Sequence, residues 1–297
     1  MRAMTRGHVR ALDRRPVAVV LSGGGNLGAA QVGMLRALVE HGVRPDLVVG
    51  CSAGAINGAS LAADPSLGGI DRLAQIWRTL ERRQLMPRGR LPRVVALARR
   101  GESIHENHGV RRLLADALGG RSFEDLAVHF ECAATDITSY RQVWFDQGSL
   151  LDAVLASSAM PAVYPSVQID GHRYLDGGII DDVPVRRAAE LGAGTLYVLQ
   201  VGAISKVPTQ LRRPLDVVLH AQWIARKHRF QRDLEALPSH VRVHLLPHGH
   251  LPHLRYDDFS RAAELIDTAY HASTAYLDEH GSHGPRHLTA AATPTAG

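Results

Sequence analysis

One serine of this chain stands in a local pattern that could activate it as a nucleophile. Ser52 lies between Gly50 and Gly54 in a G-x-S-x-G motif, directly after an apolar run at 46–49 and before a stretch of small residues at 53–63. The flanking glycines allow a strand-to-helix turn tight enough to lift the hydroxyl above the edge of a sheet, and the dipole of the following helix favours negative charge beside it. The pattern predicts acyl-transfer chemistry at Ser52, with a structural serine that caps a helix as the alternative.

A glycine-rich loop upstream could hold the negative charge that such chemistry develops. Gly23–Gly25 and Gly28 separate an apolar run at 16–21 from a helical pattern at 28–41. Without side chains, the loop backbone can approach a ligand closely, and the N–H groups at a helix N-terminus attract anions. Two anions fit this description, the oxyanion of a tetrahedral intermediate and a phosphate.

The same glycines also match the dinucleotide fingerprint G-x-G-x-x-G. That fingerprint requires an acidic residue at the carboxyl end of the second strand, where it holds a ribose. Here the second strand ends in Gly50, Cys51 and Ser52, while Asp46 lies at its beginning. A nucleotide site is therefore disfavoured, and a non-catalytic nucleotide- or lipid-binding module is an alternative function.

A hydroxyl nucleophile needs a base, and an aspartate is the best-placed candidate. Asp176, followed by Gly177 and Gly178, ends the second strand of an expected hairpin whose turn is formed at 170–171. A carboxylate whose pKa is raised by burial can take a serine proton. None of the 17 histidines lies in a comparable setting. A hydrolase with a Ser-Asp-His triad is still an alternative, as is an aspartate that only opens a glycine turn.

Together these three blocks resemble the patatin-like phospholipases of the bacterial type in their order, spacing and context. Two further stretches are similar to that family, 156–165 before the aspartate motif and 181–184 after it, and the resemblance spans about 17–201. It implies a serine acyl hydrolase without cofactors that cleaves carboxylic ester bonds of lipids, of the phospholipase A or lipid esterase type. It also implies an α/β fold, a three-layer α/β/α sandwich with a mainly parallel central sheet.

The resemblance assigns a role to each block. Ser52 would be the nucleophile and Asp176 the general base of a dyad without a histidine. The backbone N–H groups of Gly23, Gly24 and Gly25 would form the oxyanion hole. The other motif glycines would support the turns: Gly28, Gly50, Gly54, Gly177 and Gly178. An acyltransferase, which passes the acyl group to an acceptor other than water, is an alternative outcome of the same dyad.

The chain departs from the family's usual pattern at two places. Leu27 stands where a basic residue usually precedes the last glycine of the first block, which weakens the expectation of anionic head-group binding there. Asp181 and Asp182 stand where an asparagine is common after the aspartate motif. Neither change involves the expected dyad, and no motif specifies the head group, acyl chain length or position of cleavage.

The 297 residues are sufficient for one large core, and no repeat or linker divides them. We expect a flexible basic leader at 1–15, one acyl hydrolase domain at 16–281 and a disordered tail at 282–297. Within the domain, short helical patterns at 70–118 form a candidate cap or lid. A long helix at 214–237 is expected to pack in the core through an apolar stripe: Leu215, Leu219, Trp223, Phe230, Leu234 and Leu237.

Positive charge is concentrated in one zone of the sequence. The whole chain carries a formal net charge of +5, whereas residues 72–112 contain eleven arginines and three glutamates. This zone predicts peripheral contact with an anionic membrane surface, with a solvated helix face as the alternative. Because no aromatic platform interleaves with the arginines, we expect no nucleic acid partner.

Cysteine content and hydropathy favour a cytoplasmic protein, with a position peripheral to a membrane as the alternative. Cys51 and Cys132 are the two cysteines, too few for a disulfide framework, and we expect no secretory signal and no membrane span. We expect no cofactor and no metal, because the His248 and His250 pair lacks an acidic ligand at the expected place. His172 is expected at the surface of the hairpin turn.

Overall fold

The computed structural model describes residues 15–86, 103–201, 214–250, 254–255 and 257–281. In this part of the chain, eight strands form one sheet in the order β5-β6-β3-β2-β1-β7-β8, with β4 also paired to β3. The strands are β1 (Val17–Leu21), β2 (Leu47–Cys51), β3 (His129–Asp136), β4 (Arg141–Phe145), β5 (Val167–Ile169), β6 (His172–Asp176), β7 (Thr195–Leu199) and β8 (Arg242–Leu245).

The centre of the sheet is parallel and one end is antiparallel. Strand β1 pairs in parallel with β2 and β7, β2 pairs in parallel with β3, and β7 with β8. Strands β4 and β6 run antiparallel to β3, and β5 runs antiparallel to β6. The central strands β1, β2 and β7 are buried apolar runs, as parallel strands covered on both faces usually are.

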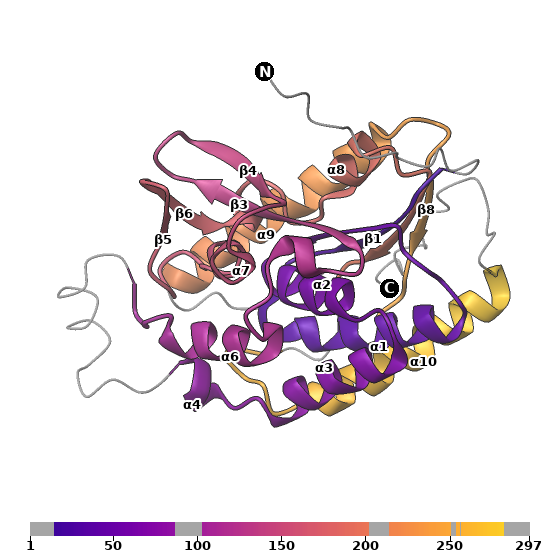
Figure 1. Ribbon diagram of the computed structural model, residues 1–297, viewed down its shortest axis with the longest axis horizontal. Coiled ribbons are helices and arrows are strands. Elements are labelled where there is room, and N and C mark those ends of the chain that lie inside the picture. Colours follow the sequence, from indigo (N-terminus) through magenta and orange to yellow (C-terminus); the bar gives the residue numbers. More distant parts are fainter. Residues whose placement is uncertain (1–14, 87–102, 202–213, 251–253, 256, 282–297) are drawn as a thin grey trace, which may run out of the picture.

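Helices cover both faces of this sheet (Figure 1). Alternate residues of β1 point to opposite sides, so Val19 and Leu21 join one apolar cluster while Ala18 and Val20 join another. The first cluster takes side chains from α1 (Gly28–Glu40), α2 (Ala53–Ala63), α3 (Leu67–Thr79), α6 (His108–Leu118), α7 (Leu150–Ser157) and α10 (Ala262–His280). The second takes side chains from α8 (Val185–Glu190) and α9 (Pro214–Glu235). The predicted three-layer α/β/α sandwich is confirmed.

Helix α9 packs in the core only over part of its length. Phe230 is buried, and Leu234 and Leu237 pack against the second apolar cluster, as the predicted stripe requires. Trp223 of the stripe is half-buried, and two apolar residues of α9 outside the stripe, Val217 and Ile224, are exposed. The side chains of the stripe's first two leucines lie outside the described residues.

The described part of the zone at 70–118 belongs to the helical layer beside the first cluster. It contains most of α3, the short helix α4 (Arg82–Leu85) and α6. Helix α3 contacts α1 and α2, and α6 contacts α2 and α7. Residues 87–102 lie outside the described residues, as do nearly all of the expected leader and the expected tail. A cap function for this zone stays a prediction.

Candidate active site

Ser52 occupies a sharp turn between β2 and α2. It directly follows the last strand residue, Cys51, and its backbone angles are φ 54° and ψ −123°. A non-glycine residue in such a conformation is strained by about 1–3 kcal/mol and is held only where its surroundings require it. Gly54 allows the close approach that the turn needs, because a side chain there would overlap the carbonyl groups of Leu21 and Ser22 at the end of β1. The backbone at Ser52 thus has the sharp strand-to-helix turn that a nucleophile elbow requires.

The pairing of β3 explains how Ser52 comes to lie beside Asp176. Residues 134–136 of β3 pair with both β4 and β6, so β4 and β6 lie on opposite edges of β3. Residues 132–133 pair with both β4 and β2, so β4 and β2 also lie on opposite edges. Strands β2 and β6 therefore share one edge of β3 and follow each other along it.

The carboxyl ends of β2 and β6 meet on this shared edge. Strand β2 runs parallel to β3 and its last residue, Cys51, pairs with Ala133. Strand β6 runs antiparallel to β3 and its last residue, Asp176, pairs with the next position, Ala134. Because the two strands run toward each other, the chain leaves β2 with Ser52 directly beside Asp176.

The two side chains form a buried hydrogen-bonded pair. Ser52 Oγ donates to Asp176 Oδ2 at 2.6 Å, and the two residues are only 7% and 2% exposed. Asp176 Oδ1 accepts the Gly178 N–H at 2.8 Å and lies 3.8 Å from Cys51 Sγ. Burial raises the pKa of Asp176, whereas the Arg226 cation and these hydrogen bonds lower it. The Asp176 carboxylate is therefore hydrogen-bonded directly to the Ser52 hydroxyl. Among the described residues, no histidine is hydrogen-bonded to the Ser52 or Asp176 side chain.

The glycine loop lies beside this pair, and its three consecutive glycines differ in their hydrogen bonding. The Gly23 N–H donates to the Asp182 carbonyl at 3.0 Å. The N–H groups of Gly24 and Gly25 take no part in the backbone hydrogen bonds of the described residues. Gly25 has a left-handed backbone with φ 57°. Of the three amides, only that of Gly23 is therefore used in the described backbone hydrogen bonds.

Side chains hold the glycine loop from two sides. Asn26 Nδ2 donates to the carbonyl oxygens of Arg255 and Asp258 at 2.9 and 2.6 Å. Asn57 Nδ2, from α2, donates to the Gly28 carbonyl at 2.9 Å. The loop is therefore fixed both to the segment before α10 and to the helix that follows the nucleophile.

A model of the patatin-like phospholipase family matches residues 19–189, which is more than half of the chain. The chain belongs to the patatin-like phospholipase family. The resemblance to this family that the sequence analysis described is thus confirmed. The matched residues include the loop, the elbow and the aspartate motif.

Curated relatives are similar over about two thirds of the chain. It is 32% identical to Lysophospholipase nte1 of Aspergillus terreus over 203 residues, which are 66% of this chain and 12% of the relative. It is 33% identical to patatin-like phospholipase domain-containing protein 7 of Mus musculus over 196 residues, 65% of this chain and 14% of the relative. The chain thus spans only a small part of these much longer relatives.

Two solved structures are also similar. VipD from Legionella pneumophila shares 16% identity with a TM-score of 0.47, over 90% of this chain and 67% of that chain. The ExoU–SpcU complex from the type III secretion system of Pseudomonas aeruginosa gives 18% identity and a TM-score of 0.41, over 89% of this chain and 51% of that chain.

In this patatin-like domain, two serines that the sequence analysis did not select hold the backbone of the nucleophile. Ser157 Oγ, fully buried at the end of α7, accepts the Ser52 N–H at 3.0 Å. Ser158 Oγ donates to the Ser52 carbonyl at 3.3 Å. Both lie in the stretch 156–165, whose resemblance to the family was the one signal that could have found them.

Sequence reasoning also missed an arginine beside the dyad. Arg226 of α9 has Nη1 3.2 Å from Asp182 Oδ1, and its side chain is 19% exposed. The apolar stripe predicts α9 as a core helix. Nothing in the local sequence distinguishes Arg226 from the other arginines of this helix. Only the docking of α9 over the aspartate turn reveals its position.

Other residues selected from sequence lie apart from the dyad. His172 is half-exposed at the hairpin turn, as expected, and its Nδ1 lies 2.8 Å from Asp136 Oδ2. In the described residues, no group of three or more histidine, cysteine or acidic side chains could hold a metal ion. Nor does any described helix have the length and apolar character needed to cross a membrane.

The basic zone is partly neutralised by carboxylates. Four of its described arginines pair with acidic residues outside the zone and one with a glutamate inside it. The pairs are Arg72–Asp64, Arg78–Asp267, Arg82–Asp257, Arg111–Asp152 and Arg83–Glu81. The described part of the zone therefore carries much less unpaired positive charge than its sequence indicates.

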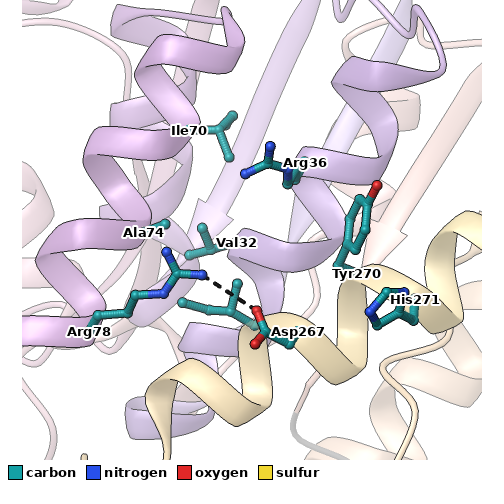
Figure 2. Close-up of a pocket in the computed structure, with 9 residues that line it drawn as sticks. Val32, Arg36, Ile70, Ala74, Arg78, Asp267, Tyr270 and His271 are labelled. Carbon is teal, nitrogen blue, oxygen red and sulfur yellow. Dashed lines mark hydrogen bonds and ion pairs between the residues drawn. The ribbon is translucent and has the colours of Figure 1, made fainter.

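A surface groove of about 270 Å³ lies between α1, α3 and α10. Figure 2 shows its apolar lining by Val32 and Ile70, with Arg36 along the rim and Arg78 reaching toward Asp267. Neither dyad residue lines it. Arg36 lies eight residues after the start of α1, about 12 Å along the helix from the glycine loop.

Proposed function

We propose that this chain is a serine acyl hydrolase that cleaves carboxylic ester bonds of lipids through a Ser52–Asp176 dyad. The observation that carries the proposal is the 2.6 Å hydrogen bond between the Ser52 hydroxyl and the buried Asp176 carboxylate. A strained elbow presents the hydroxyl, and Gly24 and Gly25 lie in the adjacent loop with their amides available for an oxyanion hole.

The reaction has two halves with the same base. In the first, Asp176 takes the Ser52 proton while Oγ attacks the ester carbonyl, and the amides of Gly24 and Gly25 stabilise the tetrahedral oxyanion. When this intermediate collapses, the C–O bond of the ester breaks and protonated Asp176 gives its proton to the leaving alcohol. In the second half, Asp176 takes a proton from water, hydroxide attacks the acyl-enzyme, and Ser52 leaves with that proton as the carboxylic acid is released.

The environment of Asp176 suits this role. An aspartate in water has a pKa of about 3.9, too low to compete well for a serine proton. Burial raises the pKa of Asp176 and so makes it a stronger base. The few hydrogen bonds that it accepts keep the carboxylate aimed at Ser52 without saturating it.

A lysophospholipid is the first lipid substrate to test. The printed names of the fungal relatives describe lysophospholipases, although this chain spans about an eighth of their length. A single-chain lipid presents its ester with less apolar bulk than a two-chain lipid. Release of a free fatty acid would support hydrolysis, whereas transfer to an added alcohol in place of release would identify an acyltransferase.

We also propose a cytoplasmic protein that contacts anionic membranes peripherally. The two cysteines are both free, which suits a reducing compartment. The arginine-rich zone at 72–112 supports the contact, although the ion pairs of its described part weaken it. Sedimentation with anionic and neutral liposomes tests this proposal: equal, salt-independent binding to both would contradict electrostatic docking.

A fluorophosphonate probe tests the dyad directly, because it forms a covalent bond with activated serines. We expect labelling of the unmodified protein, none of Ser52→Ala, and strongly reduced labelling of Asp176→Asn. Ser60→Ala, a change of another α2 serine whose Oγ bonds only the Ile56 carbonyl, serves as the matched control and should label normally.

Other results of the probe experiment would support a different mechanism or a different function for this chain. Loss of labelling in His172→Gln or another single histidine variant, with Asp176→Asn unaffected, would indicate a histidine-containing triad. Absence of labelling in the unmodified protein, with lipid present as well as without it, would leave a non-catalytic lipid- or nucleotide-binding module.

A further inference from the structure

Asp182 is a buried carboxylate close to the proposed general base, and an asparagine is common in the family at either this position or that of Asp181. Asp182 is 6% exposed. Its carbonyl accepts the Gly23 N–H at 3.0 Å, and a side chain at Gly23 would overlap its Oδ1. The same Oδ1 lies 2.7 Å from where a Cβ of Gly178 would stand. Asp182 therefore fills the space between the glycine loop and the turn that carries Asp176.

Arg226 reaches this space from α9, in the helical layer formed by α8 and α9. Its Nη1 lies 3.2 Å from Asp182 Oδ1. Its Nη2 lies 2.8 Å from where a Cβ of Gly178 would stand, so the guanidinium packs closely over this turn in space that the glycine leaves open. The Gly178 N–H is the group that holds Asp176 Oδ1. The cation thus lies over the backbone that positions the base.

Two buried carboxylates next to each other cannot both ionise easily, because each disfavours the charge of the other. Burial raises the pKa of Asp182 to about 6, against the lowering effect of Arg226. Burial also raises the pKa of Asp176, and again Arg226 is the largest opposing influence. The Arg226 cation therefore lowers the pKa of both carboxylates.

The other charged or titratable groups near the proposed base are Cys51, Asp181 and Arg229. The Cys51 thiol faces Asp176 from β2, and burial raises its pKa so that it is neutral at physiological pH. Burial raises the pKa of Asp181 to about 6, against the lowering effect of the Arg229 cation. Arg229 Nε in turn bonds Asp233 Oδ2 at 3.0 Å. Arg226 is thus the cation that acts on Asp176.

We propose that Arg226, held in place by Asp182, is a positioning residue that keeps the general base ionised and aimed at Ser52. This inference rests on the proposed dyad. Gly23 and Gly178 have no side chains and so leave room for the Arg226–Asp182 ion pair, which occupies the space between them. Asp182 and Arg226 then form one ion pair beside the base, in which the arginine acts on Asp176 and the aspartate holds the arginine.

The test is the pH dependence of kcat/KM for p-nitrophenyl butyrate in four variants. These are Arg226→Gln, Asp182→Asn, the double variant, and Arg229→Gln, which breaks a neighbouring ion pair on the same helix. Arg226→Gln should move the acid limb to higher pH and lower activity near pH 7 by about 10- to 100-fold, since one pKa unit is a tenfold change in the ionised fraction. Asp182→Asn and Arg229→Gln should leave the limb at or below its original pH.

The double variant isolates the effect of the cation. It removes both members of the Arg226–Asp182 ion pair, so Asp182 is not left as a buried charge without its partner, and the variant should fold even if Arg226→Gln does not. We expect it to be about tenfold more active than Arg226→Gln, with an acid limb at higher pH than that of Asp182→Asn. Arg226→Lys, which keeps a positive charge, should hold the limb near its original position.

Two results would overturn the inference while leaving the dyad intact: an unshifted acid limb in Arg226→Gln, or equal limbs in Asp182→Asn and the double variant. Failure of the dyad would look different, because Asp176→Asn would then keep its activity and its probe labelling. A purely structural role for Arg226 would lower the thermal unfolding midpoint without moving the limb.

Discussion

Asp136 and Asp176 end two paired strands, β3 and β6, and both carboxylates are almost completely buried, with 3% and 2% of each residue exposed. Each aspartate is followed by a turn, and the local sequence around each is typical of an aspartate that begins a turn. Their surroundings differ in the number of donors. Asp136 accepts from the N–H groups of Thr138 and Ser139, from the Ser139 hydroxyl, and from His172.

These donors determine opposite chemical behaviour. The bonds from Ser139, Thr138 and His172 hold the pKa of Asp136 well below its usual range. Asp176 accepts two strong hydrogen bonds, from Ser52 and Gly178, and burial raises its pKa. A saturated carboxylate stabilises a turn, whereas an under-saturated one in the same sheet is basic enough to take a proton.

The largest expected difference between the two aspartates is in activity. Asp176→Asn should lower kcat/KM for a lipid ester by about 10³-fold, because loss of a general base typically removes 10²- to 10⁴-fold. Asp136→Asn should stay within about threefold of the unmodified protein, because that carboxylate touches no part of the dyad. Equal losses in both, with both variants folded by circular dichroism, would contradict the distinction.

The support of the elbow should have the next largest effect. Ser157→Ala removes the acceptor of the Ser52 N–H and should lower kcat by about tenfold or more, since small displacements of a catalytic group are costly. Ser158→Ala should cost much less, because the Ser52 carbonyl also accepts from the N–H groups of Ala55 and Ile56. Measured kcat values that rank the two variants in the opposite order would argue against this role.

The pH profile should sharpen the comparison further. Asp176 acts as a base only when ionised, so kcat/KM should fall as the pH falls through its raised pKa. The acid limb should therefore lie above the value of about 3.9 that is ordinary for an aspartate. The Asp136→Asn variant should show the same acid limb. A limb that moves in this variant would mean that Asp136, and not Asp176, is the group whose titration is observed.

The smallest expected effects are on stability, and their signs are opposite. The folded pKa of Asp136 is lowered, so its stabilisation is present above the unfolded pKa and is lost as the pH falls through the folded one. The folded pKa of Asp176 is raised, so stability is lost as the pH rises through it. Near pH 7, thermal unfolding should show a midpoint a few degrees lower for Asp136→Asn and a few degrees higher for Asp176→Asn.

Much of the site could be predicted from sequence because its parts are local. The elbow depends on two glycines around Ser52 and on apolar strand residues before it, all within a few positions. The oxyanion loop was also recognisable, although the structure shows that the Gly23 N–H is already bonded to Asp182. Arg226 and Ser157 were missed because their roles depend on contacts between distant segments.

The sequence by itself determined the family, the strand-loop-helix order and the candidates Ser52 and Asp176, because glycine positions and apolar periodicity act over short distances. Only the tertiary structure decided that these two residues, 124 positions apart, lie within one hydrogen bond of each other. The physical reason is the pairing of β3, which lines up the ends of β2 and β6 along one edge. The same packing decided which of two buried aspartates is inert, since donors from the surrounding turns set the proton affinity of each.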